Sequence, residues 1–252
     1  MSVFLLTSAG HSPGVTTLAV ALATNSIGPA LLVDANPEPD QSVLAGYLQG
    51  IDPGGRGLGG LLQAHRERRP LENELAGMTV SLGEPGHDFL PGFSSPGMAG
   101  LFGPAWPDLT AALASESGLV VVDCGRIGAA GLPSALVKVA AGVLVVTGSR
   151  LVDLAALRLY LPEVVEAAGP ERTGLIVVGP GRPYGSGEIA ARFGVRVWAK
   201  IAWRPAEAEV FAAGEPPPRR LAAGAFLADV RGLSATLAER TEGHRRLIGV
   251  PS

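Results

Sequence analysis

The sequence has very little lysine and almost no cysteine. Of its 20 basic residues only Lys138 and Lys200 are lysines, and Cys124 is its one cysteine. A single cysteine excludes an internal disulfide framework and a cysteine-rich metal site. Charged residues make up 17% of the chain and the formal net charge is −3. No overall charge therefore draws the chain toward nucleic acid or anionic lipid.

Long apolar runs are missing as well. No run of about 18 apolar residues is free of charges and turn residues, so we expect no membrane span. The apolar run at 3–6 has no basic residue before it, which favours a first strand over a signal peptide. We therefore expect a soluble, cytoplasmic protein. The length of 252 residues and the hydrophobic content of 47% predict one domain over residues 1–252.

Apolar runs of strand length alternate with helical segments. Most of these runs are rich in Val, Ile and Leu on both faces, as parallel strands covered by helices require. The pattern predicts an α/β fold with a doubly wound, mostly parallel sheet and helices on both faces. Strands are predicted at 3–8, 30–35, 78–83, 119–124, 142–148, 173–179 and 195–201. Helices are predicted at 16–26, 40–48, 104–116, 132–140, 150–168, 186–193, 205–213 and 220–240.

Two segments rich in glycine and proline interrupt this alternation, at 50–60 and 84–104. They predict long loops over the edge of the sheet where ligands bind. The apolar residues of the second segment are candidates for an interface, or for packing back onto their own subunit; they are Leu90, Phe93, Met98, Leu101 and Phe102.

The segment AGHSPGVTT at 9–17 joins the first predicted strand to the first helix. Glycines permit a tight turn there, and the N–H groups that begin the helix form an anion site. The phosphate-binding fingerprint G-x-x-x-x-G-K-[ST] places a lysine where this chain has Val15. The alternative is an ordinary Gly-Pro turn before a helix. Nucleotide-binding residues predicted here are Gly10, His11, Ser12, Pro13, Gly14, Val15, Thr16 and Thr17.

Two predicted strands end in a carboxylate. Asp34 closes the second strand in LLVDANP, and Asp123 closes the fourth in LVVVDCGR. Parallel strands bring such residues to the same rim as the loop, where a carboxylate can hold Mg²⁺ through water or orient an attacking water. Asp34 is the catalytic candidate, and Thr16 and Asp123 are the candidate metal ligands. Either aspartate can instead cap a turn.

Four segments in this order resemble the MinD/ParA family of deviant Walker-A ATPases over nearly the whole chain. They are SAGHSPGVTTLAVALA, LLVDANPEPDQSV, LVVVDCGRIG and IAWRPAEAEVFAAGEPP. The resemblance is nearest to the TadZ- and CpaE-like members, which often have altered phosphate loops. It implies a P-loop NTPase-like fold and sites for ATP and Mg²⁺. It also places Arg204 and Pro205 in the late loop that contacts adenine.

The chain departs from the family at its cations. The two lysines of the family loop fall on Gly10 and Val15, and Asn36 replaces the second aspartate of the VDxDP motif. Losing such a cation costs roughly 10³ or more in the rate of phosphoryl transfer. His11 and Ser12 could still donate hydrogen bonds to phosphate, and Arg126 or Arg150 could lend charge.

Three functions remain open. The first is a positioning, scaffold or regulatory partner, a pseudo-ATPase in cell division, partitioning or pilus placement. The second is an active ATPase that uses an unusual cation. The third is a DNA-binding segregation factor using the basic clusters at 65–69 and 217–220. We expect a homodimer, or a complex with a related subunit, across the loop rim. The tail after Glu239 is not expected to form a membrane anchor.

Overall fold

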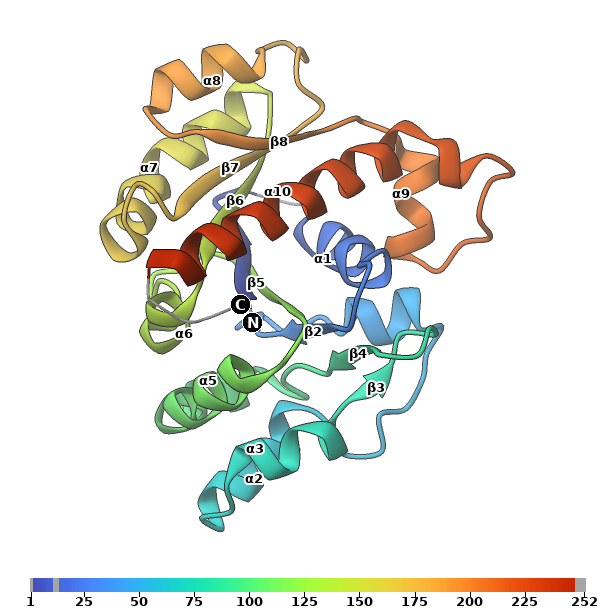
Figure 1. Ribbon diagram of the computed structural model, residues 1–252, viewed down its shortest axis with the longest axis vertical. Coiled ribbons are helices and arrows are strands. Elements are labelled where there is room, and N and C mark those ends of the chain that lie inside the picture. Colours follow the sequence, from blue (N-terminus) through green and yellow to red (C-terminus); the bar gives the residue numbers. More distant parts are fainter. Residues whose placement is uncertain (1, 11–13, 248–252) are drawn as a thin grey trace.

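The computed structural model describes residues 2–10 and 14–247, with side chains as far as residue 241. Eight strands form one sheet in the order β3-β4-β2-β5-β1-β6-β7-β8, and every neighbouring pair except β3 and β4 is parallel (Figure 1). The strands are β1 Ser2–Ser8, β2 Ala30–Asp34, β3 Val80–Ser81, β4 His87–Leu90, β5 Leu119–Arg126, β6 Gly142–Gly148, β7 Thr173–Val178 and β8 Val197–Ile201. The predicted fold class is confirmed.

Helices cover both faces of the sheet (Figure 1). The α-helices are α1 Val15–Thr24, α2 Leu58–Arg66, α3 Leu71–Glu74, α4 Pro96–Leu101, α5 Trp106–Ser115, α6 Ser134–Val139, α7 Leu151–Ala168, α8 Ser186–Phe193, α9 Pro205–Ala212 and α10 Ala225–Leu247. Short 3₁₀ turns lie at η2 Leu75–Met78, η3 Gly103–Ala105 and η4 Leu221–Ala223, and a π-helical turn lies at η1 Val43–Tyr47. The predictions for α7, α8 and α9 agree with these bounds within one residue.

Two apolar cores lie on opposite faces of the sheet because strand side chains alternate. In β1, Phe4 and Leu6 enter the core beneath η1, α1, α9 and α10, whereas Val3 and Leu5 enter the core beneath α2, α3, α5, α6, α7 and α8. Both pairs are buried. The apolar runs on both faces of the central strands follow from this double coverage.

The predictions were wrong between residues 50 and 104. The predicted strand at 78–83 is only the two-residue β3, antiparallel at the edge, and β4 pairs with β2 instead. Helix α2 begins inside the first predicted loop, and β4 and α4 lie inside the second. The glycines of LGGLLQAHR lower helix propensity, but burial of Leu58, Leu61 and Leu62 against the sheet overrides it.

The apolar residues of the second glycine-rich segment mostly form core. Leu90, Phe93 and Phe102 are buried, and the ring of Phe102 meets those of Phe93 and Trp106 edge-on at centroid distances of 5.5 and 4.8 Å. Met98 packs against this core partly buried, whereas Leu101 stays 55% exposed. Of the two alternatives left open by the sequence, packing back onto their own subunit is therefore correct for the three buried residues, and an interface is wrong for them.

Candidate functional site

The described part of the loop between β1 and α1 ends in a left-handed glycine. Gly14 is the N-cap of α1 with φ 89° and ψ 36°, a left-handed conformation that favours glycine, and its carbonyl oxygen accepts a hydrogen bond from the N–H of Leu18 at 2.9 Å. Upstream, Ser8 Oγ donates to the carbonyl oxygen of Gly10 at 3.0 Å. His11, Ser12 and Pro13 lie outside the described residues.

Val15, which occupies the position of the missing lysine, packs into the protein interior. Its side chain is buried with Leu18 in the core beneath α1. Thr16 and Thr17 follow in the first turn and are half-buried. The hydroxyl of Thr16 donates a hydrogen bond to the carboxylate of Asp123. The structure thus brings the two predicted metal ligands together, in contact with each other.

Asp34 and Asp123 are partners in the register of β2 and β5. Both are buried. Burial raises the pKa of Asp34 to about 7, with a further rise from the charge of Asp123. Burial likewise raises the pKa of Asp123 to about 6, although hydrogen bonds from Thr16 and from the N–H of Gly125 oppose the rise. Two carboxyl groups with raised pKa values therefore lie side by side at this edge of the sheet.

The chain packs closely around these two carboxyls. The N–H of Asn36 donates to Asp34 Oδ1 at 3.1 Å, and the N–H of Gly125 donates to Asp123 Oδ1 at 2.8 Å. Gly125 has φ 59°, and a Cβ there would collide with the amide of Asn36. A Cβ at Gly92 would collide with the carboxylate of Asp34. We call Asp34, Asp123, the residues that bond them and the turn at Gly14 the acidic rim.

Solved structures share this architecture. A ParA family ATPase from Chlorobium tepidum TLS has a TM-score of 0.70 at 20% identity, covering 94% of this chain and 97% of its own. MinD in the MinC:MinD cell division complex from Aquifex aeolicus has 0.69 at 16% identity, covering 95% and 96%. Septum site-determining MinD with Mg-ADP from Pyrococcus horikoshii OT3 has 0.66 at 18%, covering 92% and 94%. The chain has the fold of the MinD and ParA proteins. A scan against protein-family models gives no match, and neither does a search of curated proteins.

Two arginines could replace the lysines of the MinD/ParA loop, and each of them lies beside a carboxylate. Arg126 lies 3.4 Å from Glu38, and Arg150 binds Asp153 at 3.1 Å while 69% of its side chain is exposed. The two lysines of the chain are elsewhere, Lys138 in α6 and Lys200 in β8. Among the described residues, the acidic rim therefore fits the phosphates of a nucleotide poorly, because its charged side chains are carboxylates.

The described residues also give little support for a magnesium site. Thr16 and Asp123 have the oxygen atoms that Mg²⁺ prefers, yet across 2–10 and 14–247 no group of three or more His, Cys, Asp or Glu could hold a metal ion. Their role as metal ligands stays a prediction.

Arg204 and Pro205 begin α9 at the carboxyl end of β8. Pro205 is the first residue of the helix, Arg204 is its N-cap, and both are exposed. Because β8 runs parallel to its neighbours through β7 and β6 to β1, this turn lies at the same edge of the sheet as the β1–α1 loop. Helix α9 packs against α1. The placement agrees with the late loop expected from the resemblance, although contact with adenine remains a prediction.

Sequence reasoning missed Asp40 and Gly92. The charge of Asp40 raises the pKa of both Asp34 and Asp123. The acidic run DANPEPD carries a signal for it, since Asp40 follows Asp34 by six residues across a proline-rich turn. Gly92, in the PGF that follows β4, gave no such signal, because its contact with Asp34 depends on a strand that the sequence did not predict.

Proposed function

We propose that this chain, as one domain over residues 1–252, is a MinD/ParA family protein that positions or regulates a partner with weak or no ATP turnover. The observation that supports this most is Val15. It replaces the phosphate-binding lysine and its side chain is buried in the core. Phosphoryl transfer depends on fixed positive charge beside the phosphates, and the acidic rim supplies carboxyl groups instead.

The fold supports the rest of the proposal through the names of similar proteins. They include MinD in a complex with MinC and proteins of plasmid partition. We propose by analogy that this chain also acts through a protein partner, in cell division, partitioning or pilus placement, and that it works in the cytoplasm. Association with a second copy or a related subunit across the acidic rim would then depend little on nucleotide.

The test measures phosphate release and ATP binding in parallel on the purified protein with Mg²⁺. We expect release at background and weak or absent binding. Turnover comparable to that of a MinD or ParA protein, abolished by Asp34→Ala, would overturn the proposal. If turnover is found, Arg126→Ala separates an ATPase that uses this unusual cation from one that does not.

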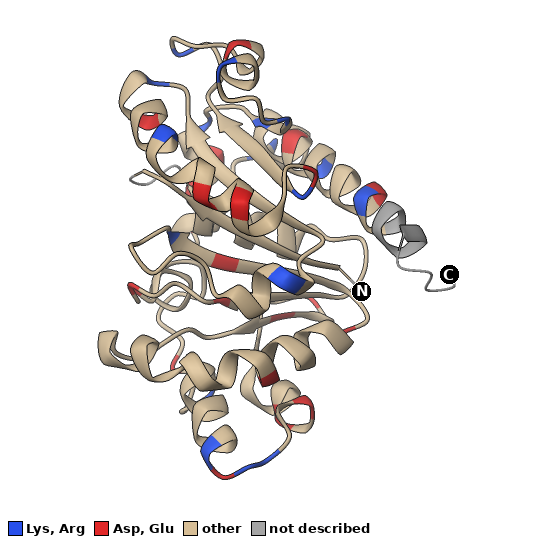
Figure 2. Ribbon diagram, turned by 90° about the vertical axis from the view of Figure 1, so that its left-hand side faces the viewer, with Lys and Arg blue, Asp and Glu red and all other residues tan. Residues whose placement is uncertain are grey.

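The basic clusters support DNA binding less well. Arg69 pairs with Glu67 at 2.9 Å and also with Glu74, and His65 contacts Asp108 at 2.8 Å. These carboxylates offset part of the charge of the 65–69 cluster. Figure 2 shows basic and acidic residues interspersed over the face that it presents. Binding to duplex DNA that weakens steeply with salt would favour the DNA-binding alternative.

A further inference from the structure

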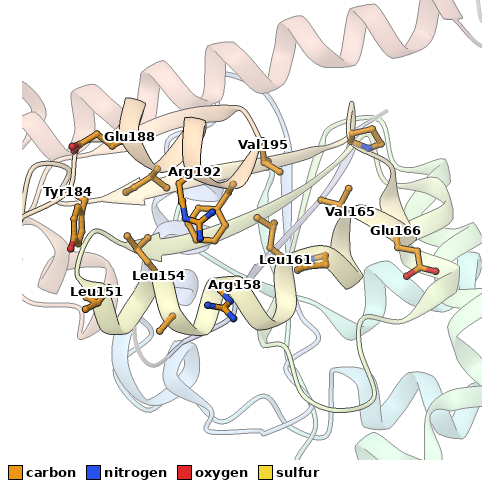
Figure 3. Close-up of a pocket in the computed structure, with 16 residues that line it drawn as sticks. Leu151, Leu154, Arg158, Leu161, Val165, Glu166, Tyr184, Glu188, Arg192 and Val195 are labelled. Atoms are coloured by element: carbon orange, nitrogen blue, oxygen red, sulfur yellow. The ribbon is translucent and has the colours of Figure 1, made fainter.

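A long apolar groove lies between α7 and α8, on the face of the sheet opposite α1 (Figure 3). It encloses about 1090 Å³. Side chains from both helices and from the turns beside α8 line it, among them Leu151, Leu154, Leu161, Val165, Ile189 and Val195. We call this the α7–α8 groove. It is separate from the acidic rim.

Helix α7 presents apolar side chains both to the core and to the groove, and Leu161 belongs to both. Leu157, Val164 and Ala168 are buried against the sheet. A second stripe lines the groove at positions 151, 154, 155, 158, 161, 162 and 165. This is the spacing of three and four residues that forms one side of a helix–helix contact. Its 14 residue steps correspond to about 21 Å, or four turns.

Two arginines interrupt the apolar surface in the middle of the groove. Arg158 comes from α7 and Arg192 from α8, and Figure 3 shows both in the central part. Within the described part of the chain neither has a carboxylate within ion-pair distance. Glu188 lies at one end, where its carboxylate accepts from the N–H of Gly185 at 2.6 Å, and Glu166 lies at the other.

The backbone adds an acceptor beside these arginines. Pro162 lies inside α7 and lines the groove, and it has no N–H to donate. The carbonyl oxygen of Arg158 therefore lacks its usual intrahelical donor. The groove thus offers two cations and this backbone acceptor along a mainly apolar stretch, with Glu188 and Glu166 at its ends.

We propose that the α7–α8 groove binds an amphipathic helix of a partner protein, with apolar residues at three- and four-residue spacing and an aspartate or glutamate near its middle. The charge selects the acidic residue, since two arginines face the centre without a carboxylate. The geometry selects a helix: the stripe on α7 has helical spacing, and no residue of a strand lines the groove, so there is no strand edge for an extended peptide to pair with. The site does not involve nucleotide and goes beyond the function proposed above.

The test selects ligands without assuming a sequence. A display library of 18-residue helix-forming peptides is panned against the full chain, with counter-selection on the double variant Arg158→Glu/Arg192→Glu. Both arginines are exposed, so the variant should fold, which circular dichroism checks. We expect enriched peptides to be amphipathic and to carry a central acidic residue. Their affinity should fall at least about tenfold in the double variant.

Matched controls separate charge in the groove from charge in general. Lys138→Glu changes an exposed lysine on α6, outside the groove, and should leave affinity within about twofold. Replacing the central glutamate of a selected peptide by lysine should abolish binding to the wild type and restore binding to the double variant. Failure of this charge exchange would overturn the assigned role of the arginines.

Other outcomes overturn the proposal directly. Selection that yields only binders insensitive to the double variant, or only basic or extended ones, contradicts it. A dimer seen by sedimentation without peptide and lost in the double variant would assign the groove to a second copy. Binding of decanoate at the groove, with no groove-dependent peptide, would assign it to a small amphiphile. None of these results depends on ATP, so they can be told apart from failure of the proposed pseudo-ATPase function.

Discussion

The acidic rim and the α7–α8 groove have opposite kinds of charge and opposite exposure. At the rim, Asp34 and Asp123 are buried side by side, with hydrogen bonds but without the lysine of an ordinary phosphate loop. In the groove, Arg158 and Arg192 are exposed among apolar side chains. Buried charge costs folding free energy, whereas exposed charge costs little. The rim should therefore dominate stability, and the groove should dominate recognition.

The largest effect should come from the apolar core that borders the rim. Phe102→Ala removes a fully buried ring that contacts Phe93 and Trp106, and we expect the free energy of unfolding to fall by about 3 to 5 kcal/mol. Leu101→Ala, at the neighbouring residue with 55% exposure, should cost about 1 kcal/mol or less. Denaturant unfolding measures both. Equal costs would mean that this segment is not part of the core.

The next largest effect should be the pH dependence of stability caused by the paired carboxyl groups of Asp34 and Asp123. Their pKa values of about 7 and 6 exceed the ordinary value of 3.8, so the folded state holds protons that the unfolded state releases. This stabilising contribution is complete below pH 3.8 and is lost as the pH rises through about 6 to 7. Relative to Asp34→Asn, the wild type should lose about 2 to 4 kcal/mol of unfolding free energy between about pH 4 and pH 8.

A matched variant tests the assignment of this pH effect. Glu163→Gln removes an exposed carboxyl on α7 and should give a stability curve parallel to that of the wild type. A curve for Asp34→Asn that also runs parallel to the wild type would contradict the raised pKa of Asp34. It would then follow that solvent reaches this carboxyl in solution.

The sequence predicted the acidic rim better than the surfaces around it. Long apolar runs such as that of β5 identify strands buried on both faces, and an aspartate at the end of such a strand must lie at the ligand-binding edge. The short HDFL of β4 carries no comparable signal between a glycine and a proline. The sequence does not indicate the groove either. An apolar stripe on α7 has the same residue pattern whether or not a neighbouring helix covers it.

A smaller effect tests whether the rim still cradles phosphate. Val15→Lys should strengthen binding of Mg²⁺-ATP by about 1.5 to 3 kcal/mol, because the ammonium makes a charge-assisted contact with phosphate. The lysine stem can take the buried place of Val15 while its charge reaches outward. Val15→Met is the uncharged control, and titration calorimetry measures both. If the lysine and methionine variants bind alike, the turn at Gly14 does not hold phosphate.

The smallest effect should come from the groove. Arg158→Ala and Arg192→Ala should each change the free energy of unfolding by less than about 0.5 kcal/mol, because exposed arginines without a carboxylate partner contribute little to folding. Arg172→Ala is a useful contrast. Its guanidinium donates to the carbonyl oxygens of Val137 at 2.9 Å and Ala140 at 3.0 Å, so its loss should cost about 1 to 3 kcal/mol. Denaturant midpoints with unchanged slopes measure all three. If Arg158→Ala lowers the free energy of unfolding as much as Arg172→Ala, then Arg158 already stabilises the fold. It would then not be available to bind an acidic helix.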